Sequence, residues 1–414
     1  RVADVLRVKF ELGLFDQPFV DASKAPAIVH SPQNEAVTLE AARKSIVLLK
    51  NDAQALPWNP DTIGTVLVTG PGADDVHPMI SRYGPGQSDV ITPLAGIREL
   101  LADRVEVIHA KGTDYRDARF PGSDILPEPP NTEEQALLDE AIAAAAEADA
   151  IVVVVGDDHS TVGESRSRTS LDLPGHQLLL VKEMVKSGKP VTVVLMSGRA
   201  ASINWIDQNV PGIFACWHGG EKVGQAVAET LFGAYNPGGK LPITFPQTAG
   251  QIPLAFPHRN GAWGEQNKSA DENGWGSTRL VDPLYHFGHG LSYTTFKYTN
   301  LKIQPKEPTA DDVITITCDL TNTGQLAGDE VVQLYVKDVV ATVAPFDKVL
   351  RGFERVSLAP GETQTVVFKL NPRRDLKMLD LNKNWVVEPG EFKVMLGTSS
   401  SPEGVMQAGN FILQ

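Results

Sequence analysis

Cysteine is scarce in this sequence: its 414 residues include only Cys216 and Cys318, which stand about 100 residues apart. Two thiols provide neither a disulfide framework nor a cysteine-rich metal site. We expect the two residues to lie in different domains, as small, buried, apolar side chains. Their presence leaves the cellular compartment open.

Long apolar runs are absent as well. A membrane-spanning helix needs about 20 consecutive apolar residues, and the longest run here, residues 148–156, has the length of a buried strand. We therefore expect no association with a membrane. No charged-then-apolar leader opens the chain at Arg1, which says little because the chain need not begin where its gene begins.

The sequence also lacks any block of basic residues. Lys and Arg number 37 against 51 Asp and Glu, which gives a formal net charge of −14 at pH 7. A nucleic acid would be repelled over most of such a surface, so we expect no nucleic-acid partner. A neutral substrate such as a sugar is compatible with this charge.

Between residues 31 and 245, unbroken apolar strands alternate with helices. Ser31 followed by Pro32 is a helix start signal, and this helix is expected to run to about Lys44. Such an alternation is typical of a mostly parallel sheet covered on both faces, so we predict an α/β sandwich. The predicted strands are residues 45–49, 65–69, 105–109, 151–155, 191–196 and 213–217, and the further helices are residues 133–147, 174–186 and 221–232.

The pattern differs on both sides of this region. Residues 1–16 predict a helix that stops at Gly13 and needs a partner for its apolar face, and residues 21–31 predict a linker. Residues 246–296 are irregular and rich in Gly and Pro, which predicts a segment that wraps between domains. Beyond residue 296 the apolar residues recur with period two, which indicates a β-sandwich. The strands predicted there are residues 313–318, 331–336, 365–370 and 391–396.

Two motifs suggest ligands but fit them poorly. Gly70-Pro71-Gly72 follows a strand like a dinucleotide-binding turn, yet the third glycine is missing and acidic residues follow. We favour a tight turn there. His159 with Asp157 and Asp158 is a weak metal-ligand pattern, because the carboxylates are adjacent and no second histidine accompanies them, so we favour capping or hydrogen bonding. We expect neither a metal nor a cofactor.

The most unusual loop, residues 156–168, follows the most hydrophobic strand and carries three carboxylates, one histidine and two arginines. Loops at the carboxyl ends of parallel strands are where such sheets place ligands. Glu164 is its candidate catalytic residue. From its chemistry alone, a loop of this composition is more often a solvated, salt-bridged turn than a catalytic site.

Five segments of the sequence are long and distinctive: RVKFELGLFD at 7–16, AARKSIVLLKN at 41–51, WHGGE at 217–221, NPGGKLPITFP at 236–246 and YHFGHGLSYTTF at 285–296. Together they resemble glycoside hydrolase family 3. Residues 7–16 are similar to the end of the family's N-terminal (β/α)8-type barrel, and residues 41–51 to the start of its α/β sandwich domain. The later segments are similar to the end of that domain and to the lead into a fibronectin type III-like domain.

The resemblance implies roles for four residues. Glu164, after a hydrophobic strand and before Leu171-Asp172-Leu173-Pro174, corresponds to the general acid/base. Arg168 corresponds, more loosely, to an arginine that accompanies it. Tyr83 is the candidate aromatic beside the aglycone, with Arg82 second, although local packing explains a turn aromatic equally well. The nucleophile of the family is an Asp on the barrel, and nothing here matches its motif.

These implications define an expected enzyme. It is a retaining β-glucosidase that removes terminal β-D-glucosyl residues, in which this chain supplies Glu164, an N-terminal barrel supplies the nucleophile, and the chain alone is inactive. The alternatives are a β-xylosidase or another exo-β-glycosidase of the family, and a noncatalytic carbohydrate-binding or scaffold protein. A homodimer and a periplasmic or extracellular location are further expectations. The expected division is a barrel tail (residues 1–20), the α/β sandwich (21–245), a connecting segment (246–296) and the fibronectin type III-like domain (297–414).

Overall fold

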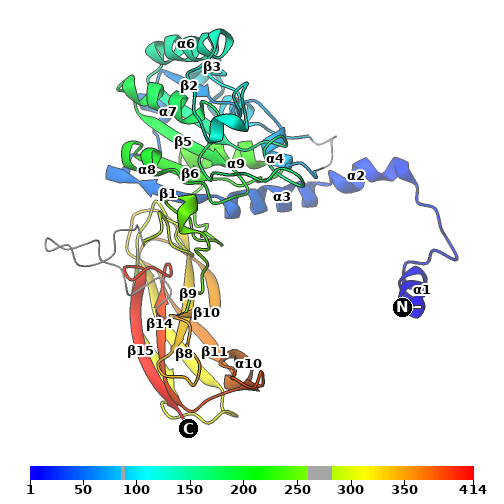
Figure 1. Ribbon diagram of the computed structural model, residues 1–414, viewed down its shortest axis with the longest axis vertical. Helices are drawn as coiled ribbons and strands as arrows, with labels where there is room; N and C mark the ends of the chain where they lie inside the picture. Colours follow the sequence, from blue (N-terminus) through cyan, green and yellow to red (C-terminus); the bar gives the residue numbers. More distant parts are fainter. Residues whose placement is uncertain (85–88, 260–281) are drawn as a thin grey trace.

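The computed structural model describes residues 1–84, 89–259 and 282–414 (Figure 1). A layered α/β domain lies at one end of the long axis and a β-sandwich at the other, while the first helices project to one side. The fold class predicted from the sequence, an α/β sandwich followed by a β-sandwich, is confirmed.

One six-stranded sheet forms the centre of the α/β domain. Its strand order is β1-β6-β5-β4-β2-β3, and every neighbouring pair is parallel except β1 with β6. The sheet is therefore mostly parallel, as predicted. Its strands are β1 (Val47–Asn51), β2 (Thr65–Thr69), β3 (Glu106–Ala110), β4 (Ala150–Gly156), β5 (Val191–Met196) and β6 (Gly212–Ala215).

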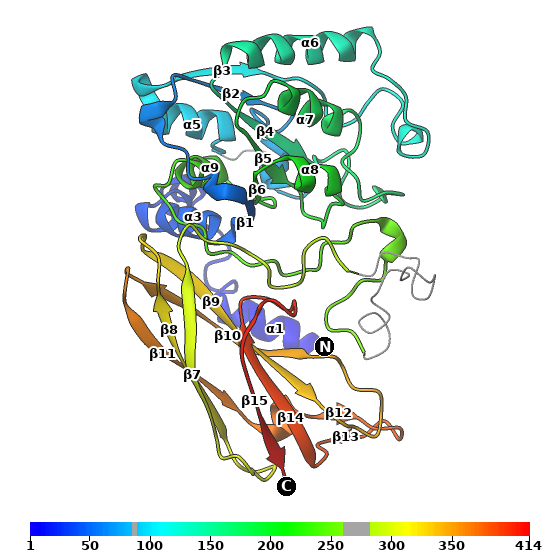
Figure 2. The same ribbon diagram turned by 90° about the vertical axis from the view of Figure 1, so that its left-hand side faces the viewer.

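Helices cover both faces of this sheet (Figure 2). Successive side chains of a strand point to opposite faces, so Ile151 and Val153 of β4 pack into one core and Val152 and Val154 into the other. This explains why the strands read as continuous apolar runs. One face carries α6 (Thr132–Glu147), α7 (Gln177–Lys186) and α8 (Asn204–Asn209), and the other α3 (Pro32–Ser45), α5 (Pro93–Leu101) and α9 (Val223–Leu231).

The second domain consists of two antiparallel sheets with the strand orders β10-β9-β14-β15 and β11-β8-β7. Inward-facing residues of both sheets form one core, in which Phe392 stacks on Phe411 at 5.3 Å between ring centroids. The strands are β7 (Phe296–Gln304), β8 (Ile314–Asn322), β9 (Gly328–Asp338), β10 (Val349–Leu358), β11 (Thr363–Leu370), β14 (Gly390–Gly397) and β15 (Val405–Leu413). A short helix α10 (Pro372–Asp375) and the hairpin of β12 (Met378–Leu379) and β13 (Trp385–Val386) complete this domain.

The described parts of the connecting segment contact both domains. Leu291 pairs with Leu48 of β1 in an isolated antiparallel bridge. On the other side, the Gln333 side-chain amide donates to the backbone carbonyl of Gly288 at 3.0 Å. The two domains also touch directly, where buried Lys240 and Glu330 form an ion pair at 3.0 Å. Residues 260–281 of the segment lie outside the described residues.

The first helices have no partner among the described residues. α1 (Val2–Glu11) and the short α2 (Ala25–Val29) contain no buried residue, and Phe10 is 66% exposed. Gly13, the predicted helix stop, lies just after the C-cap of α1 and has a φ of +67°. Residues 21–31, predicted as a linker that ends in an N-cap, contain short helical turns without buried residues, and Ser31 caps α3.

The thiols and the helix lengths agree with the sequence patterns. Cys216 is buried in the α/β domain and Cys318 in the β-sandwich, and both are free. In the described part of the chain, each helix is too short or too polar to span a bilayer.

Candidate active site

The candidate loops meet where the order of the sheet reverses. From β2 the chain moves to β3 on one side, and it later returns to place β4 on the other side of β2. The carboxyl ends of β2 and β4 are therefore adjacent, and the loops that follow them, residues 70–84 and 157–176, lie side by side. Such switch points are where doubly wound sheets bind ligands.

Glycines let the chain leave both strands sharply. A Cβ on Gly70, at φ +99°, would lie 2.2 Å from the backbone oxygen of Val154. A Cβ on Gly156, at φ +145°, would lie 1.9 Å from the backbone oxygen of Met196. Only glycine fits such close backbone approaches. The Gly70-Pro71-Gly72 motif thus has a local packing reason, as the tight-turn interpretation requires.

Glu164 lies at the tip of its loop. Gly163 and Ser165 on either side both have positive φ, +97° and +61°, which turns the chain sharply around the glutamate. The residue is exposed. Its carboxylate has no hydrogen bond or ion pair with any described residue, so it is available to a ligand or to another domain.

The neighbouring loop holds the backbone of Glu164. The Glu164 N–H donates to the Tyr83 hydroxyl oxygen at 2.7 Å, and Nη1 of Arg82 donates to the Glu164 carbonyl at 3.0 Å. A Cβ on Gly163 would lie 2.6 Å from Cδ of Arg82. The structure thus brings together three of the four predicted site residues. The Tyr83 side chain is 66% exposed.

A buried carboxylate fixes the root of the same loop. Asp157 accepts hydrogen bonds from the hydroxyls of Thr161, at 2.8 Å, and Ser197, at 2.6 Å. The guanidinium groups of Arg168 and Arg199 approach it at 3.6 and 3.4 Å. Because Ser197 and Arg199 follow β5, Asp157 ties the loops after β4 and β5 together.

Arg168, the fourth predicted residue, has an almost fully buried side chain, 4% exposed. It forms a bidentate pair with Asp124 at 3.0 and 3.3 Å and donates to the carbonyl of Asp172 at 3.2 Å. Its guanidinium lies 5.5 Å from the centre of the Phe120 ring. These contacts hold the loop together from inside, and the role of Arg168 in substrate binding stays a prediction.

Reasoning from the sequence missed the partners that hold this loop. The sequence favoured hydrogen bonding for Asp157 but did not identify Thr161, Ser197 and Arg199 as its partners. Asp124 lies 44 positions from Arg168 in a stretch without periodicity, so the sequence carries no signal for their pairing.

The histidine of the loop makes contacts of its own. His159 packs on His77 with 4.4 Å between ring centroids, and its Nδ1 lies 3.5 Å from Asp158. Asp158 accepts hydrogen bonds from the backbone N–H and the hydroxyl of Ser160 at 2.9 and 2.5 Å. This is the capping geometry that the sequence favoured over a metal cluster.

Another cluster has the composition of a metal site. Potential ligand atoms of His30, Glu35 and Glu221 lie within 4.8 Å of one another. However, Nζ of Lys222 lies 2.5 Å from Glu35. Hydrogen bonds from Lys222 and His30 lower the pKa of Glu35, and the bond to Glu35 raises the pKa of His30. An ammonium already occupies the carboxylate, so the donor set does not fit a cation.

Comparison with known proteins matches both domains. Residues 46–293 match the glycosyl hydrolase family 3 C-terminal domain, and residues 330–400 match the fibronectin type III-like domain. A β-xylosidase of Formosa agariphila is 39% identical over 410 residues, and a periplasmic β-glucosidase of Salmonella typhimurium is 35% identical over 417 residues. Each alignment covers 96% of this chain and 53% of the relative.

Solved structures of β-glucosidases also superpose on this chain. A β-glucosidase from Erythrobacter marinus superposes with a TM-score of 0.85 at 32% identity, over 98% of this chain and 54% of that chain. A β-glucosidase from Listeria innocua in complex with glucose superposes with a TM-score of 0.84 at 28% identity. This superposition covers 99% of this chain and 53% of that chain. The chain spans about half the length of the curated relatives it matches.

These findings define the class as that of the glycoside hydrolases, enzymes that cleave glycosidic bonds. Within this class, the chain belongs to glycoside hydrolase family 3. The resemblance seen in the sequence is therefore confirmed.

Proposed function

We propose that this chain supplies the general acid/base, Glu164, of a retaining exo-β-glycosidase of the β-glucosidase type. The observation that carries the proposal is the contrast within one loop. Its root is fixed by the buried carboxylate of Asp157 and its tip through the Glu164 backbone, whereas the Glu164 carboxylate has no partner among the described residues. A side chain that is held in place but not used internally fits a group that acts on a substrate.

The reaction needs a second carboxylate. In retaining glycosidases the two carboxyl groups lie roughly 5 Å apart. A nucleophilic Asp attacks the anomeric carbon while the proton of Glu164 passes to the leaving glycosidic oxygen, whose bond to that carbon breaks. The Glu164 carboxylate then takes a proton from a water, the water oxygen bonds to the anomeric carbon, and the bond to the Asp breaks. The sugar leaves with its configuration retained.

An N-terminal barrel is the proposed source of that Asp. A general acid works near neutral pH where burial or a nearby carboxylate disfavours its ionised form, and the exposed Glu164 has to gain this environment from a covering surface. α1 and α2 present apolar side chains without a partner among the described residues. Leaving each such side chain in water costs about 1.5–3 kcal/mol, so we propose that these helices pack on the barrel. The chain without a barrel is expected to be inactive.

The second candidate activity is that of a β-xylosidase, because relatives named β-xylosidase and β-glucosidase match this chain to similar extents. Xylosides lack the hydroxymethyl group of glucosides. The ratio of kcat/KM for 4-nitrophenyl β-D-glucoside and β-D-xyloside, measured on the protein with its barrel, decides between the two. A higher value for the xyloside would replace the glucosidase proposal and leave the role of Glu164 intact.

Replacement of the acid/base tests the mechanism. In the barrel-containing protein, Glu164→Ala should lower kcat for cellobiose by about 10²–10⁴-fold, the usual contribution of general acid–base catalysis. With 2,4-dinitrophenyl β-glucoside the leaving group needs little protonation, so the glycosyl-enzyme should accumulate. Azide attacks without a base, and it should restore turnover and give a β-glycosyl azide.

The matched control is Glu147→Ala, which removes an exposed carboxylate from the end of α6. This variant should keep the activity of the parent and should not respond to azide. Unchanged hydrolysis of cellobiose by a folded Glu164→Ala protein would end the assignment. Loss of activity on all substrates without azide rescue would make Glu164 a structural residue.

A homodimer remains a prediction from the sequence. Sedimentation of the barrel-containing protein at two concentrations measures it directly, and a monomer at both would contradict it.

A further inference from the structure

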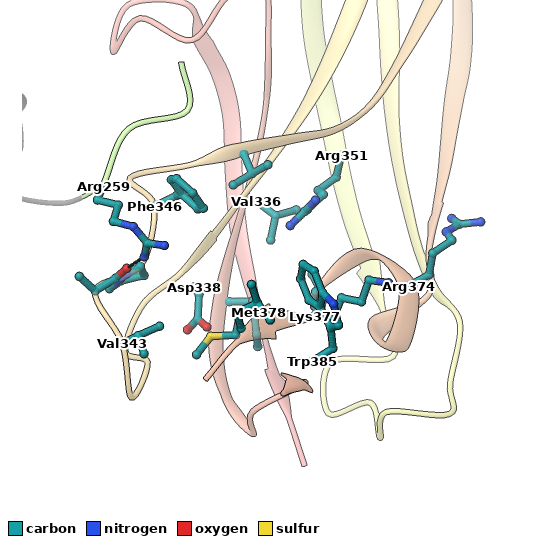
Figure 3. Close-up of a pocket in the computed structure, with 16 residues that line it drawn as sticks. Arg259, Val336, Asp338, Val343, Phe346, Arg351, Arg374, Lys377, Met378 and Trp385 are labelled. Carbon is teal, nitrogen blue, oxygen red and sulfur yellow. Dashed lines mark hydrogen bonds between the residues drawn. The ribbon is translucent and has the colours of Figure 1, made fainter. Parts of the chain in front are cut away.

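The β-sandwich contains a cavity of about 450 Å³ that is separate from the candidate active site (Figure 3). The hairpin β12–β13 and the chain between β9 and β10 contribute residues to its lining. Val336 and Phe392, which belong to the core, reach into it. Its volume is in the range of small-molecule sites, about 300–1,000 Å³.

Apolar side chains form most of its wall. Trp385 is 63% exposed and Phe346 is 37% exposed, although both line a cavity. Exposed aromatic side chains around a hollow are a common feature of ligand sites. The remaining apolar lining consists of Val343, Ala344, Pro345, Val349, Leu376, Met378 and Leu379.

The charges around the cavity are unlike those of the whole chain. Four cationic side chains and one carboxylate line it, whereas the chain carries a net charge of −14. Such a local excess of positive charge attracts anions. The cationic residues are Arg259, Arg351, Arg374 and Lys377, and the carboxylate is Asp338.

Among the described residues, Arg374 and Arg259 have hydrogen-bond or ion-pair partners, whereas Lys377 and Arg351 have none. Arg374 pairs with Asp375 at 2.6 Å, and Arg259 donates to the carbonyl of Ala344. Nζ of Lys377 lies 5.1 Å from the centre of the Trp385 ring. The Arg351 guanidinium has neither a hydrogen bond nor an ion pair with a described residue, and Figure 3 shows it among the labelled lining residues.

Asp338 provides a second polar contact. It is the last residue of β9 and pairs with Phe392 of β14, so it continues the inward-facing row of Leu334 and Val336. Burial raises its pKa to about 6, with a smaller contribution from Glu388. A carboxylate in this position accepts a hydrogen bond from a ligand hydroxyl.

We propose that this cavity binds a hydroxylated aromatic carboxylate. The ligand carboxylate pairs with Arg351, its ring lies against Trp385 and Met378, and its hydroxyl donates to Asp338. A bidentate arginine–carboxylate pair gives orientation as well as affinity. The apolar wall excludes a sugar as the preferred ligand, because most hydroxyls of a pyranose would lose water without gaining a partner, which is costly for each group.

Titration calorimetry on the whole chain at pH 7 and low salt tests the proposal with 4-hydroxycinnamate as the probe. A ligand of about 12 heavy atoms in such a site is expected to bind with Kd on the order of 0.1–1 mM. Cinnamyl alcohol, which lacks both the carboxylate and the ring hydroxyl, should bind at least tenfold more weakly. Glucuronate, which has a carboxylate but no aromatic ring, should show no saturable heat at the same concentrations.

Variants locate the site. Arg351→Gln should weaken binding of 4-hydroxycinnamate at least tenfold, and Trp385→Ala should weaken it as well. The matched control is Arg373→Gln, an exposed arginine of α10 that pairs with Asp311 and does not line the cavity, and it should bind like the parent. Circular dichroism and thermal unfolding establish that each variant is folded, and Arg351→Lys provides a second test that retains the charge.

Three outcomes would overturn the proposal: no binding of 4-hydroxycinnamate at 5 mM, equal affinity for cinnamyl alcohol, or tighter binding of glucuronate. Binding that Arg351→Gln and Arg351→Lys both leave unchanged would place the ligand elsewhere and would also contradict it. None of these results bears on Glu164, because the cavity lies in the other domain.

Discussion

Two aspartates at strand ends, one in each domain, differ in the partners that surround their carboxylates. Asp157 directly follows β4 and is surrounded by two hydroxyl donors and two arginines. Asp338 ends β9 on the core side of its sheet, and among the described residues it has a backbone contact at Val340 but no cationic partner within ion-pair distance. The Asp157 carboxylate therefore holds neighbouring loops in place. The Asp338 carboxylate can still bind a proton or a ligand.

Burial alone therefore does not say what a charged residue does. A carboxylate with its lone pairs satisfied holds neighbouring loops in one geometry, because separating it from its donors leaves buried charges unpaired. A half-buried carboxylate without such donors changes its pKa instead. The satisfied group lies beneath a candidate catalytic loop, and the unsatisfied one lines an open cavity.

The strongest test of this comparison is Asp157→Ala. This substitution removes the carboxylate that Arg168 and Arg199 share. Breaking a buried ion pair by removing one partner typically costs about 3–5 kcal/mol of stability. Urea unfolding of the chain should show a loss of this size for the α/β domain. Asp103→Ala, at an exposed position before β3, is the matched control and should change the free energy of unfolding by less than about 0.5 kcal/mol.

A loss below about 1 kcal/mol for Asp157→Ala would mean that solvent satisfies the arginines, and the contrast between the two aspartates would disappear. In the barrel-containing protein the same variant should also lower kcat, since the root of the Glu164 loop would no longer be fixed. This second measurement separates a role in positioning from one in stability alone.

Asp338→Asn should raise the free energy of unfolding, the opposite of Asp157→Ala, and by a smaller amount. The folded-state pKa of Asp338, about 6, lies above the ordinary value of about 3.9, so the folded state favours the protonated carboxyl. That stabilisation is present below the unfolded-state pKa and is lost as the pH rises through about 6. One pKa unit corresponds to about 1.4 kcal/mol, and solvent screening of a half-buried group reduces the total.

We expect Asp338→Asn, relative to the parent, to gain about 1 kcal/mol of stability between pH 4 and pH 7. The gain should level off above pH 7, where the aspartate is fully ionised. Thermal or urea unfolding at several pH values measures it. A pH-independent difference between the two proteins would show that Asp338 titrates normally, and the comparison with Asp157 would then rest on geometry alone.

Among these variants, Tyr83→Phe should change the free energy of unfolding least. It removes the hydroxyl that accepts the N–H of Glu164 but keeps the ring. Because both groups are accessible to water, the net loss of stability should be about 0.5–1 kcal/mol or less. In the barrel-containing protein, KM for aryl glucosides should stay near that of the parent, whereas Tyr83→Ala should raise it if the ring contacts the aglycone.

Equal KM values for both Tyr83 variants and the parent would remove the tyrosine from the proposed substrate site. Its bond to Glu164 would then be its whole role. This result would sharpen the distinction between residues that hold the loop and residues that act from it.

The predicted strands show where local sequence suffices. β2 and β5 were predicted to the residue, because buried parallel strands read as continuous apolar runs between turn residues. Helix α7 was predicted to begin at Pro174 but begins at Gln177. The reason is Gly175, whose φ of +61° interrupts a helix that a proline would otherwise start.

Elements escaped prediction for different reasons. β10 alternates weakly because it is an edge strand and most of its side chains are partly or fully exposed. α5 has the same Pro-initiated start as α3, and Thr92 caps it as Ser31 caps that helix, so a usable signal was overlooked. The pairing of Arg168 with Asp124 depends on how distant loops pack, and no local pattern encodes such a contact.

One feature of the sheet bears on how this domain can be rebuilt. Its first and last strands, β1 and β6, pair with each other at one edge, and Leu291 pairs with β1 as the chain passes toward the sandwich. The chain thus enters and leaves the α/β domain at the same edge of its sheet. Loops at domain surfaces are where insertion and circular permutation succeed. We therefore expect that a neighbouring domain can be replaced at this edge without changing β2, β4 or the loop that carries Glu164.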